Sequence, residues 1–186
     1  MIAALAGRRI DADDSPTPRF VLENASAVTE RIRLCFQKLP ISTLVCAAAR
    51  GADLLALDVA GALGIRRCVV LPSDAASFRA SSVVDGLTGK DQAGYEWGAI
   101  FDRIVEAVRQ NGDLIVCPGQ TTSQESYLAA NLAILDEAAR LAVATGEEAK
   151  AIVVWNLESR GPNDVTAAFR DEAAIRGFRI EEISTL

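Results

Sequence analysis

Short apolar runs alternate with helix-periodic segments along the whole chain, and this alternation limits the fold more than any other feature of the sequence. The apolar runs that have the length of buried strands are 1–6, 41–47, 65–71, 114–117, 151–155 and 178–183. The segments whose apolar residues repeat with a helical period are 26–38, 54–63, 97–110, 123–145 and 164–176. Such alternation is typical of βαβ units. The sequence therefore predicts an α/β fold, a Rossmann-like three-layer α/β/α sandwich whose mostly parallel sheet has about six strands, in one domain over residues 1–186.

Residue types at the segment ends support these boundaries. Gly64, Gly146 and Gly177 follow predicted helices, where glycine commonly ends a helix. Pro72 follows the third predicted strand. The stretch 73–95 after it is polar and irregular in pattern, and it is predicted to be one long functional loop.

Composition excludes several classes of function. The chain has no histidine, which removes Ser-His-Asp and Cys-His catalysis, a histidine general base and an imidazole zinc site. A net charge of −6 argues against broad binding to nucleic acid or to membranes, and no apolar run approaches about 18 residues. The four cysteines form no C-x-x-C pair, so they are predicted to be buried thiols in a reducing, cytoplasmic compartment; they are Cys35, Cys46, Cys68 and Cys117. We expect no metal and no cofactor.

Arginines gather where a ligand would bind in such a fold. Ligands of open parallel sheets lie outside the carboxyl ends of the strands, which here are followed by the segments 6–11, 47–53, 72–95, 117–125 and 156–166. Arg8, Arg9, Arg19 and Arg50 fall in or beside these segments, and a small basic pocket suits a compact anion such as phosphate. Alternatively, these arginines pair with nearby carboxylates, namely Asp11, Asp13 and Asp14.

The first two turns offer backbone and guanidinium groups to such an anion. Gly7 allows close approach of a ligand to the backbone beside Arg8 and Arg9, although neither G-x-G-x-x-G nor a P-loop motif is present. The second turn, 47–53, consists of small residues around Arg50. It either leaves a helix N-terminus open to an anion, or it packs a helix tightly on the sheet with Asp53 favourable in the first turn.

The third turn carries the one carboxylate that suits catalysis. Thr122 and Glu125 have the spacing of a capping box, and Glu125 alternatively serves as a carboxylate at a ribose or glycosidic bond. Tyr127 and Asn131 are four residues apart and share a helix face. Asparagine is a poor residue inside a helix, so Asn131 is predicted to bond either the protein backbone or a ligand.

The fourth turn follows the fifth predicted strand. Asn156 comes directly after Trp155, and Gly161 and Pro162 precede the last predicted helix. Asn163 or Asp164 is predicted to cap that helix, and the same turn could offer N–H groups to phosphate.

In their order and spacing these segments resemble the SLOG (Smf/LOG-like) superfamily of Rossmann-like domains over nearly the whole chain. The resemblance rests on GRRID at 7–11, ARGAD at 49–53, VVLP at 69–72, Tyr127 with Asn131, and Trp155-Asn156 with Gly161-Pro162. It implies a site for a nucleotide or a nucleotide-derived signal. Some members hydrolyse N-glycosidic bonds of nucleoside monophosphates, but the segment 118–125 lacks two of the glycines of their P-G-G-x-G-T-x-x-E motif.

We therefore expect a sensor or signalling domain that binds a nucleotide-type small molecule. Arg8, Arg9 and Arg50 would hold phosphate, Asp11 or Asn131 would hold the ribose, and 73–95 would cover the ligand. The full set of expected ligand-binding residues is Gly7, Arg8, Arg9, Asp11, Arg50, Gly51, Asp53, Gly119, Thr122, Tyr127, Asn131, Asn156 and Gly161. The alternatives are an N-glycosidic hydrolase or transferase with Glu125 as base or nucleophile, and a non-catalytic interaction module with a degenerate pocket. We expect a homo-oligomer, with neither membrane nor nucleic acid as partner.

Overall fold

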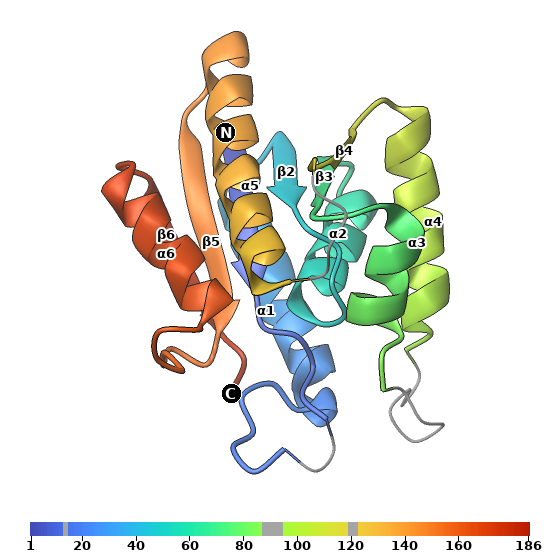
Figure 1. Ribbon diagram of the computed structural model, residues 1–186. Coiled ribbons are helices and arrows are strands. Elements are labelled where there is room, and N and C mark those ends of the chain that lie inside the picture. The colour runs from blue at the N-terminus through green and yellow to red at the C-terminus, as the bar shows by residue number, and fades with distance from the viewer. Residues whose placement is uncertain (13–14, 87–94, 119–122) are drawn as a thin grey trace.

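The computed structural model describes residues 1–12, 15–86, 95–118 and 123–186, and it forms a three-layer α/β structure (Figure 1). The strands are β1 (Ile2–Gly7), β2 (Thr43–Cys46), β3 (Arg66–Leu71), β4 (Leu114–Val116), β5 (Ala149–Trp155) and β6 (Arg179–Ser184). The helices are α1 (Ala25–Lys38), α2 (Ala52–Ala62), α3 (Ala75–Phe78), α4 (Trp97–Gln110), α5 (Gln124–Thr145) and α6 (Val165–Ile175). Two single turns, η1 (Leu22–Asn24) and η2 (Arg79–Val83), complete the described elements.

The strands form one sheet in the order β4-β3-β2-β1-β5-β6, and each neighbouring pair is parallel. Ile2 of β1 lies opposite Thr43 of β2 on one side and Ala149 of β5 on the other. The predicted α/β class and six-stranded parallel sheet are confirmed. The order reverses at β1, because successive strands add outward to β4 on one side and the chain then returns to β5 on the other.

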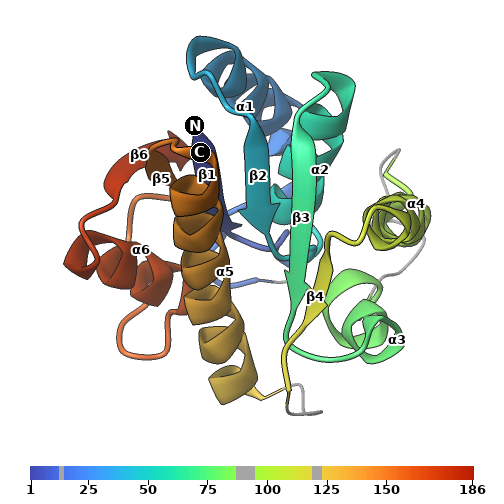
Figure 2. The same ribbon diagram turned by 90° about the horizontal axis from the view of Figure 1, so that it is seen from above.

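Helices cover both faces of the sheet, as the view from above shows (Figure 2). The helices α1, α2 and α4 pack on one face, where Ala3 and Leu5 of β1 point. The helices α5 and α6 pack on the other face, where Ile2 and Ala4 of β1 point. Side chains alternate between the faces of a strand, so the continuous apolar sequence of β1 supplies both cores at once.

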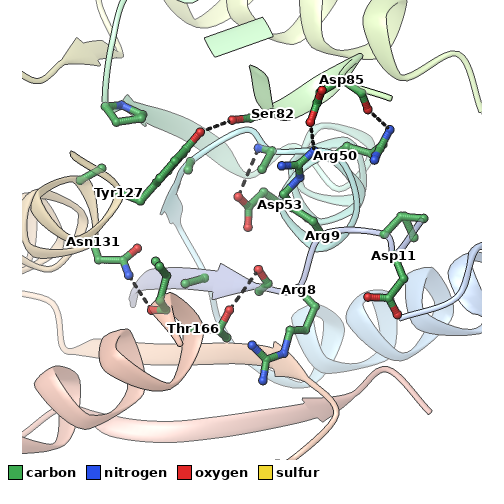
Figure 3. Close-up of a pocket in the computed structure, with 18 of the residues that line it drawn as sticks. Arg8, Arg9, Asp11, Arg50, Asp53, Ser82, Asp85, Tyr127, Asn131 and Thr166 are labelled. Carbon is green, nitrogen blue, oxygen red and sulfur yellow. Dashed lines mark hydrogen bonds and ion pairs between the residues drawn. The ribbon is translucent and has the colours of Figure 1, made fainter. Parts of the chain in front are cut away.

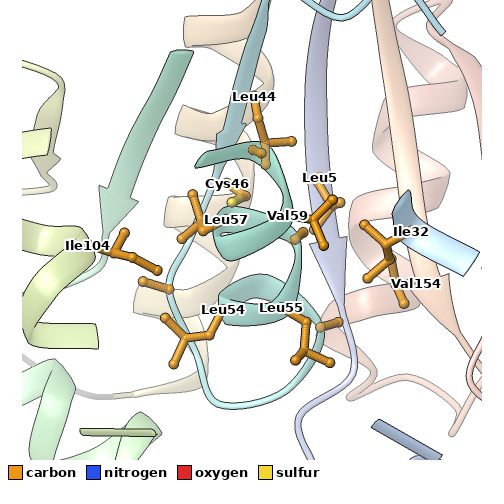
Figure 4. Packing of buried hydrophobic residues seen from close by; sticks show 14 of the residues in the cluster. Leu5, Ile32, Leu44, Cys46, Leu54, Leu55, Leu57, Val59, Ile104 and Val154 are labelled. Atoms are coloured by element: carbon orange, nitrogen blue, oxygen red, sulfur yellow. The ribbon is translucent and has the colours of Figure 1, made fainter. Parts of the chain in front are cut away.

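Helix α2 is the most deeply buried helix next to β1. Leu54, Leu55, Leu57 and Val59 all face apolar neighbours, and Figure 4 shows them directed to different sides of the helix. A helix that is apolar all around its circumference needs contacts on every side. Here α1, α4 and the sheet provide those contacts.

Two glycines allow α2 to begin against the end of β1. A Cβ atom on Gly7 would lie 2.3 Å from Cβ of Ala52, and one on Gly51 would lie 2.7 Å from the Ile10 nitrogen. Gly51 has φ of 108°, a conformation that favours glycine. The Ala52 N–H donates to the Arg8 carbonyl, and the Ile10 N–H donates to the Arg50 carbonyl. Of the two interpretations of the 47–53 turn, tight packing of helix on sheet describes its backbone.

The prediction of one long loop over 73–95 is wrong for its first part, which forms α3 and η2. The carboxylate of Asp74 accepts a hydrogen bond from the Ser77 N–H and caps α3. Phe78 and Val83 then anchor the two turns in the core. Many residues of this stretch are polar, but one cap and two buried apolar side chains are enough to fold its first part.

The start of α5 also differs from the capping box predicted between Thr122 and Glu125. The helix begins one residue later, because the Ser123 side chain is the N-cap and accepts from the Ser126 N–H. Thr122 itself and Gly119 lie outside the described residues.

The cysteines are free thiols, as predicted. Cys46 and Cys68 are buried, while Cys35 and Cys117 are half-buried. Burial raises the pKa of Cys35 to about 11 and that of Cys68 to about 12. Among the helices of the described chain, none is both long enough and apolar enough to cross a membrane.

Candidate functional site

A cavity of about 750 Å³ opens at the carboxyl end of the sheet, where the strand order reverses beside β1 (Figure 3). Parallel α/β sheets bind ligands at this position. The cavity is lined by the end of β1 and the loop after it, the turn after β2, η2 and its flanks, and the facing ends of α5 and α6. Its volume lies within the range of pockets that hold small molecules.

Arg8 lies at the cavity wall, but its guanidinium is bound to other parts of the protein. It donates to both carboxylate oxygens of Asp164, at 2.6 and 2.8 Å, to Oδ1 of Asn156 and to the Glu158 carbonyl. Arg8 is 4% exposed and the Asp164 side chain is 0% exposed. In Figure 3 the Arg8 guanidinium points away from Arg9 and Arg50. The structure thus does not bring Arg8 and Arg50 together around one anion, as the sequence analysis expected.

Asp164 owes its ionised state to these bonds. Burial by itself would raise the pKa of its carboxyl, but hydrogen bonds from Arg8 and from the Arg160 and Ala167 N–H groups outweigh burial and lower the pKa well below its usual range. Asp164 also accepts from the Thr166 N–H and caps α6, as predicted. The carboxylate therefore joins β1 to the start of α6.

Arg9 and Arg50 lie on the opposite side of the cavity and contact the segment around η2. Arg50 is buried, and its guanidinium donates to the Asp85 carbonyl at 3.0 Å. The Arg9 side chain is 39% exposed, and its guanidinium contacts with described residues are long, 3.8 Å to the Asp85 carboxylate and 3.5 Å to the Ser81 carbonyl. Within the described part of the chain, Nε of Arg9 is buried without a hydrogen-bond partner. Both arginines line the cavity, together with Arg19.

Among the described residues, Asp11 does not pair with these arginines in the way that the sequence suggested. Oδ2 of Asp11 accepts from the backbone N–H groups of Arg19 and Phe20 and so closes the loop after β1. The arginines instead pair with Asp85 and Asp164, which are distant in sequence. Asp13 and Asp14 lie outside the described residues.

Asp53, in the first turn of α2, places a carboxyl group in the cavity wall. Its Oδ2 accepts from the Ala49 N–H at 3.2 Å. Its Oδ1 is buried and has no hydrogen-bond partner among the described residues. Burial raises the pKa of Asp53 to about 7, against the opposing effects of the Ala49 and Gly7 backbone N–H groups and the Arg9 charge.

Tyr127 and Asn131 share one face of α5 and both line the cavity, as their spacing predicted. The Tyr127 hydroxyl lies 2.7 Å from the hydroxyl of Ser82, which is fully buried. Asn131 donates through Nδ2 to the Val165 carbonyl at 2.8 Å. Asn131 therefore bonds the protein backbone, which is one of the two partners predicted for it. The buried ring of Phe78 lies 6.5 Å from that of Tyr127 and packs within the cavity wall, behind its surface.

Four other predicted residues do not line this cavity. Gly51 is buried at the start of α2. Asn156 is buried and holds Nε of Arg8. Gly161 lies in an exposed turn with φ of 97°. Glu125 is exposed and lines a separate, smaller hollow of about 220 Å³ beside Pro118.

Some cavity residues were absent from the predicted set: Phe78, Ser82, Asp85, Arg160 and Thr166. The first three belong to the stretch 73–95, which was expected to cover the ligand but not assigned residue by residue. Thr166 follows the predicted cap Asp164, and its position at a helix start beside β1 is the one signal that could have identified it. No group of three or more metal-binding side chains occurs within the residues that the structure describes.

The sheet, the covering helices and the position of the cavity define a Rossmann-like α/β protein. No model of a protein family matches the chain, and no curated protein matches it. Among solved structures it is similar to DNA processing protein A (DprA) from Streptococcus pneumoniae, at 14% sequence identity and a TM-score of 0.42. That alignment covers 97% of this chain and 57% of the DprA chain, so this chain spans little more than half the length of that protein.

Proposed function

We propose that the cavity beside β1 binds a nucleotide or a nucleotide-derived small molecule, and that the chain is a SLOG-like domain of the sensing type. The observation that carries this proposal is that the cavity is lined by arginines and by aromatic side chains. Arg9, Arg19 and Arg50 line the cavity, and so do Phe78 and Tyr127, within a volume of about 750 Å³. A nucleotide carries an anionic group and a flat base in one molecule, and it needs both kinds of surface.

Arg9 is the residue best placed to hold phosphate. It is partly exposed, its contacts with Asp85 and Ser81 are long, and the two planar donor edges of a guanidinium match phosphate oxygens. Arg19 lines the same cavity. Arg8 is not part of the proposed phosphate site, because its guanidinium already bonds Asp164, Asn156 and Glu158.

The aromatic side of the cavity suits a base. Phe78 and Tyr127 lie with ring centres 6.5 Å apart and planes at 57°, and Ala130 and Ile134 of α5 continue the apolar surface. Aromatic and aliphatic side chains favour stacking of a base without selecting one base. The resemblance of the sequence to SLOG domains supports the same class of ligand.

We favour nucleotide binding over hydrolysis of an N-glycosidic bond by Glu125. A carboxylate that cleaves an N-glycosidic bond must lie at the sugar, and Glu125 lines a different hollow from Arg9 and Tyr127. The net charge of −6 favours a small anion over a long polyanion. A salt-dependent complex with single-stranded DNA would contradict that preference.

The test is a ligand screen by thermal shift and calorimetry with AMP, ADP-ribose, NAD and cyclic AMP. A ligand that binds only the folded state stabilises it by about 2.7 kcal/mol at a hundredfold excess over Kd. We expect at least one of these nucleotides to bind, and Arg9→Ala to weaken that binding roughly tenfold or more, as loss of a charge-assisted hydrogen bond does.

Arg33→Ala is the matched control. Arg33 lies on α1, is partly exposed like Arg9, and pairs only with Glu30 among the described residues. The Arg33→Ala substitution removes the same charge as Arg9→Ala and should leave the affinity for the nucleotide unchanged. Failure of all four nucleotides to bind at millimolar concentration, or equal losses for Arg9→Ala and Arg33→Ala, would contradict the proposal.

A further inference from the structure

The Oδ1 oxygen of Asp53 has no hydrogen-bond partner in the described chain, although the Gly7 N–H acts on the carboxyl group and lowers its pKa. The residue is 6% exposed, and it lines the cavity. Oδ2 bonds the Ala49 N–H. Buried polar atoms are nearly always paired, and an orphaned acceptor in a cavity wall indicates a donor that arrives from outside the protein.

A purely structural role for Asp53 accounts for only half of its carboxyl group. The bond from Ala49 closes the turn between β2 and α2, and an acidic residue in the first turn is favourable for a helix. A serine or asparagine could close the same turn without burying a charge. The second oxygen and the burial of the group remain unexplained by that role.

The place of Asp53 in the cavity indicates which part of a ligand would reach it. In Figure 3 its carboxyl lies between Arg9 and Arg50 on one side and Tyr127 and Asn131 on the other, and it points toward the middle of the cavity. In a nucleotide the sugar lies between the phosphate and the base. A nucleotide with its phosphate at Arg9 and its base at Tyr127 therefore has its sugar at Asp53.

We propose that Oδ1 of Asp53 accepts a hydrogen bond from a ribose hydroxyl of the ligand, and that it makes the cavity selective for ribonucleotides over their deoxy counterparts; this rests on the proposed nucleotide site. Asp53 takes the role that the sequence analysis gave to Asp11 or Asn131. Asp11 bonds the Arg19 and Phe20 N–H groups, and the Asn131 amide bonds Val165. The ionised carboxylate is the stronger acceptor, so its raised pKa requires tests above neutral pH.

The experiment compares AMP, 2′-deoxy-AMP and 2′,3′-dideoxy-AMP by calorimetry at pH 8. We expect the wild-type protein to bind AMP roughly tenfold to a hundredfold more tightly than dideoxy-AMP, the range for a hydrogen bond to a charged acceptor. Asp53→Ala should bind the two equally. Asp53→Asn, which keeps the shape of the side chain and an acceptor for Ala49, should retain only about a threefold preference, because a neutral hydrogen bond is about half as strong.

Asp58→Asn is the control on the same helix, because Asp58 is exposed and pairs with Arg103. It should keep the full preference. If Asp53→Ala does not fold, Asp53→Asn decides the question. Equal binding of AMP and dideoxy-AMP by the wild type, or an undiminished preference in Asp53→Asn, overturns the role of Asp53 and leaves the nucleotide site standing. Absence of binding by all three nucleotides overturns both proposals.

Discussion

At the scale of single residues, the neighbouring arginines Arg8 and Arg9 have different roles. Arg8 is buried against Asp164 and lies with its guanidinium carbon 5.7 Å from the Trp155 ring centre, whereas Arg9 faces the cavity. Successive residues at a strand end point in opposite directions. Local sequence does not decide which arginine faces which way, because the partner of Arg8 lies 156 residues along the chain.

Arg8→Ala is predicted to destabilise the protein by about 3–5 kcal/mol, because it leaves the buried Asp164 carboxylate without its ion pair. Urea denaturation measures the free energy of unfolding. The control is Arg160→Ala, whose guanidinium is 44% exposed and lies 3.7 Å from the same carboxylate. That loss should cost under about 1 kcal/mol. Similar losses for both variants would mean that Arg8 contributes no more than a surface ion pair.

Asp53 gives the folded state a pH dependence. Its folded pKa, about 7, lies above the ordinary value of 3.8, so between these values the folded protein binds a proton that the unfolded chain releases. The carboxyl group therefore favours folding below about pH 4, and that contribution is lost as the pH rises through 7. The full loss corresponds to about 4 kcal/mol.

Unfolding by urea at pH 4.5, 6 and 8 tests this dependence. Asp164 does not interfere, because its lowered pKa keeps it ionised throughout that range. We expect the free energy of unfolding of Asp53→Asn to decline less between pH 4.5 and 8 than that of the wild type. Parallel pH profiles of the two proteins would show that Asp53 titrates normally.

At the scale of elements, the contact between α2 and β1 depends on residues without side chains. Gly7→Ala would place a Cβ atom 2.3 Å from Ala52 and 2.8 Å from the Val154 carbonyl, so the helix must shift away from the sheet. We predict a loss of about 1–3 kcal/mol or more in unfolding free energy, the usual cost of overpacking. Gly61→Ala, in α2 itself, meets only the flexible end of Arg67 and should change stability by less than about 1 kcal/mol. An equal, small effect of both changes would contradict the packing account.

The sequence predicted elements well where one periodic pattern ran without interruption. The helix expected over 97–110 is α4, and its buried face contains Trp97, Phe101 and Ile104 at helical spacing. The prediction failed over α3 and η2, where one cap and two buried residues outweigh many polar ones. Short helices lack enough periods to be distinguished from loops, because their stability comes from contacts made elsewhere in the chain.

At the scale of the whole molecule, the parallel sheet brings the predicted turns to one end. The order β4-β3-β2-β1-β5-β6 places the turns after β1 and β2 side by side, with the start of α6 across from them. This much followed from the alternation of strands and helices, and the shared face of Tyr127 and Asn131 followed from their spacing. The partners of Asp11, Asn156 and Arg50 did not follow from the sequence. Long-range contacts decide which polar groups remain available to a ligand, and the local pattern does not contain them.

The most direct test of the nucleotide site is a crystal structure of the protein soaked with AMP. The account predicts electron density in the cavity beside β1, with the phosphate within hydrogen-bond distance of Arg9 and the ribose at Oδ1 of Asp53. An empty cavity at millimolar AMP, or a nucleotide bound at any other place on the molecule, would contradict it.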